Sequence, residues 1–208
     1  NHLIMTKIFI IIASLITSML SAQTNYNSQM EEAILDSNYE SSTKKFIEIS
    51  KAYPDKWLPN YYLAYRTINN SLLHLKDETV LKQNLNKAQD YLDHAYKPNH
   101  NKGELLVLQA KLYLVYIISN PEKYGRSYLP IITKLNNDAF ALAPENPRVL
   151  LNKAQWEIGS ATYFGSSTVT FCKDLESAIS KFETYKADEY YAPEWGLEEA
   201  KKALNDCK

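Results

Sequence analysis

The chain has 208 residues, with 23 basic and 24 acidic side chains and a formal net charge of −1. This near-neutral charge argues against a nucleic-acid-binding protein, because phosphate backbones are bound by clustered lysine and arginine. A chain of this length, with 45% hydrophobic residues, is long enough to bury the core of one domain.

The N-terminal segment has the pattern of a secretory signal peptide. Lys7 supplies a positive charge, residues 8–20 are almost wholly apolar, and small residues end the run at Ser21-Ala22. The apolar run has about 13 residues, fewer than the roughly 20 that span a bilayer, so the pattern favours a cleaved signal over a membrane anchor. We expect residues 1–22 to be removed and residues 23–208 to form a single domain without a stable membrane span. The mature protein would then be periplasmic or extracellular.

Apolar residues at helical spacing predict helices along the whole mature chain. The expected ranges are 28–38, 42–53, 58–75, 77–96, 104–118, 127–142, 146–161, 171–187 and 193–206. Asp77 and Asn146 are expected N-caps, and residues 104–118 are the most hydrophobic stretch, expected to be the most buried helix. Asn120-Pro121 and Gly125 are expected to form a loop, and residues 163–170 a second one.

A proline follows an apolar run at nearly constant intervals. Pro54, Pro98, Pro144 and Pro193 are separated by 44, 46 and 49 residues. Such a period indicates a repeated unit, here a pair of helices. We therefore predict an all-α fold built as a superhelical array of antiparallel helical hairpins, an α-solenoid closed by a C-terminal capping helix.

The two cysteines are predicted to form a disulfide. Cys172 lies 18 residues before Tyr190 and Cys207 lies 17 residues after it, so a bend near Tyr190 would bring them side by side on antiparallel helices. An exported protein meets an oxidising compartment, which favours the bond. The alternatives are a redox-active pair, which usually has CxxC spacing, and a metal site, for which the last hairpin lacks neighbouring ligands.

Several small residues at repeated positions resemble the tetratricopeptide repeat. They are Leu63-Ala64, Ala88 with Leu92 and Ala95, Ala110 with Tyr113, Ala139 with Pro144, and Ala178 with Phe182. The C-terminal pattern of Cys172, Phe182, Pro193-x-Trp195-Gly196 and Cys207 also looks like small exported repeat proteins of the Bacteroidetes.

The tetratricopeptide resemblance implies a concave groove that binds a peptide or a segment of a partner protein. The groove residues that it implies are Tyr61, Tyr65, Lys111, Arg148 and Gln155. We predict a non-enzymatic, exported protein-interaction module. The alternative is a protein that binds a glycan or another small molecule, because some of the 16 tyrosines could serve as stacking surfaces in the groove.

No set of residues predicts catalysis, a metal or a cofactor. His74, His94 and His100 have no metal-ligand spacing, and residues 165–168, GSST, lack the lysine and the full spacing of a phosphate-binding loop. No GxSxG motif occurs. We therefore expect neither an enzyme nor a metal or cofactor site.

Overall fold

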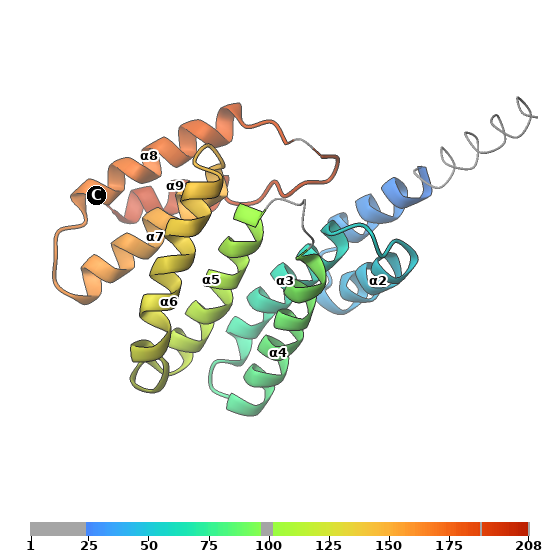
Figure 1. The fold of residues 1–208 in the computed structure, drawn as a ribbon, viewed down its shortest axis with the longest axis horizontal. Helices are drawn as coiled ribbons and strands as arrows, with labels where there is room; N and C mark the ends of the chain where they lie inside the picture. The colour runs from blue at the N-terminus through green and yellow to red at the C-terminus, as the bar shows by residue number, and fades with distance from the viewer. Residues whose placement is uncertain (1–23, 97–101, 188, 208) are drawn as a thin grey trace, which may run out of the picture.

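The computed structural model describes residues 24–96, 102–187 and 189–207. Within these ranges the chain is helical and contains no strand, which confirms the all-α class (Figure 1). A first helix covers residues 24–35. The elements that follow are α2 (Tyr39–Ala52), α3 (Leu58–Ser71), the 3₁₀ turn η1 (Leu72–His74), α4 (Glu78–Ala95), α5 (Lys102–Ser119), α6 (Pro121–Leu142), α7 (Pro147–Tyr163), α8 (Val169–Thr184) and α9 (Leu197–Asp206). The predicted signal peptide lies outside the described residues.

Side-chain caps explain where several helices begin. Asp77 accepts hydrogen bonds from the first N–H groups of α4, and Asn146 does the same for α7, as predicted. Asn38 caps α2 and Asn120 caps α6 in the same way. Each cap satisfies N–H groups that have no partner inside the helix.

Several helix starts differ from the prediction by a few residues, and two of the differences have a clear local cause. α6 begins at Pro121 instead of residue 127, because Asn120 caps it and a proline fits the first helical turn. Pro130 then lies inside the helix, on its exposed side, where water can reach the carbonyl that loses its N–H partner. α9 begins at Leu197 instead of Pro193, because Gly196 has a left-handed φ of 118° and the residues before it are extended or turn-like.

Consecutive helices pack against each other along the chain, α2 on α3, α3 on α4, α5 on α6 and α7 on α8. α5 also contacts both α3 and α7, which places it in the centre of the molecule, as expected for the most hydrophobic stretch (Figure 1). The largest apolar cluster runs from the first helix to α5, and a second joins α7, α8 and α9. These contacts fit paired helices, whereas the tetratricopeptide-like superhelix itself stays a prediction.

A buried ion pair joins α5 to α7. Glu104 Oε1 accepts from Arg148 Nε at 2.7 Å, and both side chains are only 1% exposed. Asn146 Nδ2 donates to the same Glu104 oxygen at 2.6 Å, and the Tyr61 hydroxyl donates to Oε2 at 3.2 Å. Burial, and secondly the charge of Glu104, raises the pKa of Tyr61 well above its usual value. The network therefore holds α3, α5 and α7 together through a neutral phenol and two opposite charges.

The segment 189–196, here named the strap, runs between α8 and α9 and on its way contacts the start of α3 (Figure 1). Glu189 accepts from Trp57 Nε1 at 2.7 Å, and the Tyr191 carbonyl accepts from the Tyr62 hydroxyl at 3.0 Å. Trp195 Nε1 donates to the Tyr61 hydroxyl at 2.9 Å. The strap thus binds directly to α3, more than a hundred residues earlier in the chain.

The predicted disulfide is present. Cys172 in α8 bonds to Cys207, the residue after α9, with their Cα atoms 5.9 Å apart. The bond fixes the end of α9 beside the start of α8.

Candidate ligand-binding cleft

A cleft of about 610 Å³ lies between α5, α6, α7 and α9. Clefts of a few hundred to a thousand Å³ are the size that holds cofactors and drug-sized ligands. The cleft is placed by the packing of α5 on α6 and of α7 on α5, with α9 held on the other side by α8 and the disulfide.

One wall of the cleft is aliphatic. Ala110, Leu114 and Ile117 lie along one face of α5, and Leu129 and Ile132 face them from α6. Their spacing of three and four residues puts them on one side of each helix. This wall offers apolar contact and no charge.

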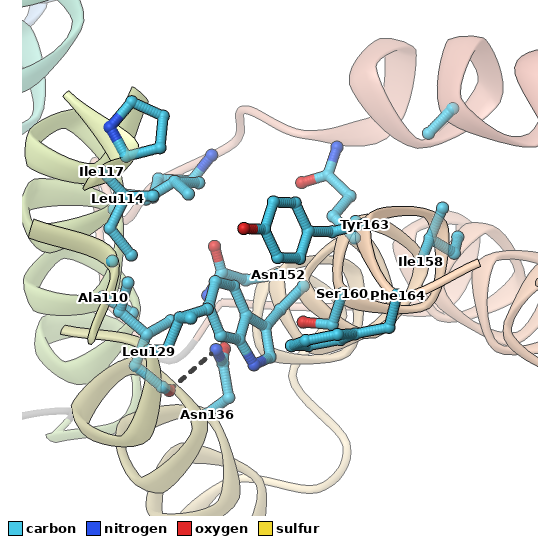
Figure 2. Close-up of a pocket in the computed structure, with 18 of the residues that line it drawn as sticks. Ala110, Leu114, Ile117, Leu129, Asn136, Asn152, Ile158, Ser160, Tyr163 and Phe164 are labelled. Carbon is cyan, nitrogen blue, oxygen red and sulfur yellow. Dashed lines mark hydrogen bonds between the residues drawn. The ribbon is translucent and has the colours of Figure 1, made fainter. Parts of the chain in front are cut away.

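The opposite wall carries three aromatic side chains. Trp156 and Tyr163 come from α7, and Phe164 follows its last turn. Figure 2 shows the ring of Tyr163 extending from α7 into the cleft, toward the side of Leu114 and Ile117. Tyr163 is 74% exposed and its ring contacts Phe164 edge-on, with centroids 5.1 Å apart. Such an arrangement suits a flat, apolar ligand bound between the aromatic wall and the aliphatic wall.

The floor of the cleft contains two amides that bond to each other. Asn152 Nδ2 donates to Asn136 Oδ1 at 2.6 Å, and Asn136 Nδ2 donates to the Ile132 carbonyl at 3.0 Å (Figure 2). Because these hydrogen-bonding groups already have partners in the protein, the floor does not require a polar ligand.

Charged residues gather at the α9 side of the cleft. Lys111 Nζ lies 3.2 Å from Glu199 Oε1, and Asp206 lines the same side further along α9. The Lys111 ammonium also lies over the ring of Trp195, 4.9 Å from its centroid. Trp195 of the strap therefore contacts Lys111 at this end of the cleft, although Trp195 itself does not line the cleft.

The five predicted groove residues lie in three different places in the structure. Lys111 and Gln155 line the cleft. Tyr65 lines a separate cavity of about 520 Å³ beside α3, where its ring stacks on Trp195 with centroids 5.0 Å apart. Burial raises the pKa of Tyr65, so its hydroxyl stays neutral. The strap thus packs directly on the α3 part of the predicted groove.

Tyr61 and Arg148 are corrections to the prediction. Tyr61 is fully buried and Arg148 is 1% exposed, and both belong to the Glu104 network. The tetratricopeptide resemblance placed both residues at the groove, but the strap and α8 cover this side: Trp195 reaches Tyr61, and Tyr185 lies against the Arg148 guanidinium.

Sequence reasoning missed the aromatic wall. Residues 163–170 were expected to be a loop, whereas Tyr163 ends α7 and Phe164 follows it directly. The available signal was the pair of adjacent aromatic residues before Gly165 in an otherwise polar stretch, because large apolar side chains in a connection often mark a binding surface.

The described residues contain no group of three or more His, Cys, Asp and Glu side chains that could hold a metal ion. Among the same residues, no helix has both the length and the apolarity needed to cross a membrane.

No protein-family model matches the chain, and no curated protein matches its sequence. The structure is similar to the solved structure of the haemophore HusA from Porphyromonas gingivalis, with a TM-score of 0.75 and 20% sequence identity. The match covers 89% of this chain and 92% of that one. At this identity the likeness shows a shared all-α fold with a protein of a Bacteroidetes species, and the tetratricopeptide assignment stays a prediction.

Proposed function

We propose that this protein is an exported, non-enzymatic carrier that binds a porphyrin-like ligand in the cleft between α5, α6, α7 and α9. The observation that carries the proposal is the shape of the cleft, about 610 Å³ between an aliphatic wall and an aromatic one. The fold that this chain shares with a haemophore supports the same ligand class. Its disulfide fits a protein that works outside the reducing cytoplasm.

The cleft would recognise the flat ring system through apolar contact. Haem iron is commonly held by His, Met, Cys or Tyr. Among the residues that line the cleft, Tyr163 is the one with such a side chain available, because Cys207 is in the disulfide. Apolar burial contributes about 25 cal/mol per Å² and needs no metal. If apolar contact supplies most of the affinity, the metal-free porphyrin should bind about as well as ferric haem.

The second candidate is the predicted protein-interaction module, with a peptide segment of a partner in the cleft. The strongly exposed pair Tyr163 and Phe164 favours it, because exposed aromatic residues often anchor partner proteins. Against it, the α3 part of the predicted groove, around Tyr65, is packed against the strap. A peptide in the cleft would therefore not extend over Tyr65, which lines a separate cavity.

The test is a titration of the purified protein with ferric protoporphyrin IX and with metal-free protoporphyrin IX, followed by the porphyrin absorption band. We expect saturable binding of both, with dissociation constants within about threefold. The double variant Tyr163→Ala with Phe164→Ala should weaken both by about tenfold or more, because it removes two aromatic contacts of roughly 0.5–1.5 kcal/mol each along with their buried area.

The control is Tyr190→Ala on the strap, since Tyr190 is 76% exposed and does not line the cleft. It should leave both affinities unchanged. Absence of saturable binding by the wild-type protein would reject the porphyrin proposal and favour a peptide partner.

A further inference from the structure

The cleft contains a single cationic side chain among the residues that line it, Lys111 of α5. The rest of the lining is apolar, aromatic, neutral polar or acidic. An amphiphilic ligand with one anionic group would therefore find one place in the cleft where that group is attracted. The position of Lys111 decides which part of the ligand lies there.

Lys111 is held in place by a group outside the cleft. Its ammonium lies 4.9 Å from the centroid of the Trp195 ring, and the same ring stacks on Tyr65 with centroids 5.0 Å apart. Trp195 is fixed in turn by its hydrogen bond to the Tyr61 hydroxyl. A charge positioned by a rigid aromatic stack loses less conformational entropy when a ligand binds.

The present partner of Lys111 is a weak one. The Lys111–Glu199 distance of 3.2 Å exceeds the 2.7–2.9 Å that is usual for a charged hydrogen bond. Lys111 is 17% exposed and Glu199 is 41% exposed, so solvent screens the pair. The carboxylate of a ligand could replace that of Glu199 at little cost, because one carboxylate exchanges for another.

The remaining charge directs the ligand. Glu199 and Asp206 lie on the same α9 side of the cleft. Asp206 repels a ligand carboxylate from its end of α9, whereas the charge of Glu199 at the other end is offset by Lys111, so the Lys111 end is the favourable one. The apolar body of the ligand would then extend from Lys111 along α5 toward Tyr163.

We propose that the ligand is an amphiphilic carboxylic acid whose carboxylate binds Lys111, and that Glu199 occupies the place of this carboxylate and competes with it. The inference rests on the proposed function, since it assigns the orientation and charge of the ligand in the same cleft. It makes Lys111 and Glu199 a pair with opposite effects on affinity. Lys111 attracts the acid, and Glu199 opposes it.

The experiment compares protoporphyrin IX with its dimethyl ester, which keeps the ring and loses both carboxylates. Wild type should bind the acid about tenfold more tightly than the ester, the factor that corresponds to one charge-assisted contact. Lys111→Met should remove this preference, because it should weaken binding of the acid far more than binding of the ester. Glu199→Gln should tighten binding of the acid by about two- to fivefold, the range of a partly exposed charge pair, without effect on the ester.

An ion pair within α9, the helix that carries Glu199, serves as the control. Lys201 and Glu198 lie on α9, 2.8 Å apart, and neither lines the cleft. Lys201→Met and Glu198→Gln change the net charge of the protein as the test variants do, and they should leave both affinities as in wild type.

The outcomes separate the two proposals. Equal affinity of wild type for acid and ester, or equal effects of Lys111→Met on both, would refute the carboxylate site and leave the porphyrin carrier standing. A failure of both ligands to bind would overturn the proposed function and this inference together.

Discussion

The buried pair Glu104–Arg148 allows a quantitative test of how the central helices are held together. Glu104→Gln keeps the size of the side chain but leaves the guanidinium of Arg148 buried without its counter-charge. Loss of one member of a buried pair costs about 3–5 kcal/mol of unfolding free energy. Both side chains are 1% exposed, so little water can compensate. For a protein of this length the loss corresponds to a fall in Tm of about 6–20 °C.

Urea unfolding followed by far-UV circular dichroism measures the effect, and a double-mutant cycle with Arg148→Met isolates the pair. The double variant should be more stable than the sum of the single losses implies, because it leaves no unpaired buried charge. Asp138→Asn is the control, since Asp138 forms an exposed pair with Lys134 and should lose less than about 0.5 kcal/mol. A loss below about 1 kcal/mol for Glu104→Gln, or additive single effects, would refute the reasoning.

Three further predictions concern the rest of the fold. Reduction of the disulfide between α8 and α9 should cost about 3–4 kcal/mol in urea unfolding, from the entropy of a loop of 35 residues, and no loss would show that α9 is held by packing alone. The folded-state pKa of Asp36 is lowered from 3.8 to about 2, first by a hydrogen bond to the Ser41 side chain and then by one to Lys45. The ionised carboxylate therefore stabilises the folded state above pH 3.8, and this stabilisation is lost as the pH falls through about 2. Asp36→Asn should therefore unfold with a weaker pH dependence between these values, and an unchanged acid profile would contradict the assignment. Gly196→Ala should lower the Tm more than Gly165→Ala. Both glycines have a positive φ, but only at Gly196 would an added Cβ lie 2.6 Å from an atom of Phe182. Equal losses of Tm would show that Phe182 moves aside.

The helices were predictable because each carries its own local signal. The caps Asp77 and Asn146 lie where the sequence indicates, and the apolar stripes around Phe46 and Leu92 are buried. The start of α6 was wrong because Asn120-Pro121 is a loop signal and a helix-start signal at once. Only the packing of α6 on α5 decides between the two.

The cleft was predictable only in part. Lys111 and Gln155, each of which follows an alanine, line it. Arg148 was expected at the same groove but lies in the core, paired with a glutamate 44 residues away. Nothing local in the sequence shows that Glu104 will be buried beside it. A contact between distant residues is a property of the fold, and helical periodicity contains no information about it.

The strap has a consequence for how the chain folds. Helical arrays are usually dominated by neighbouring contacts, so they fold quickly and can unfold from one end. Here three hydrogen bonds join residues 129 to 134 positions apart. During synthesis, α3 emerges long before the strap that covers Tyr61 and Tyr65. The first half of the protein therefore cannot reach its final state until the chain is nearly complete, and the fold should close late, in one step that makes both ends depend on each other.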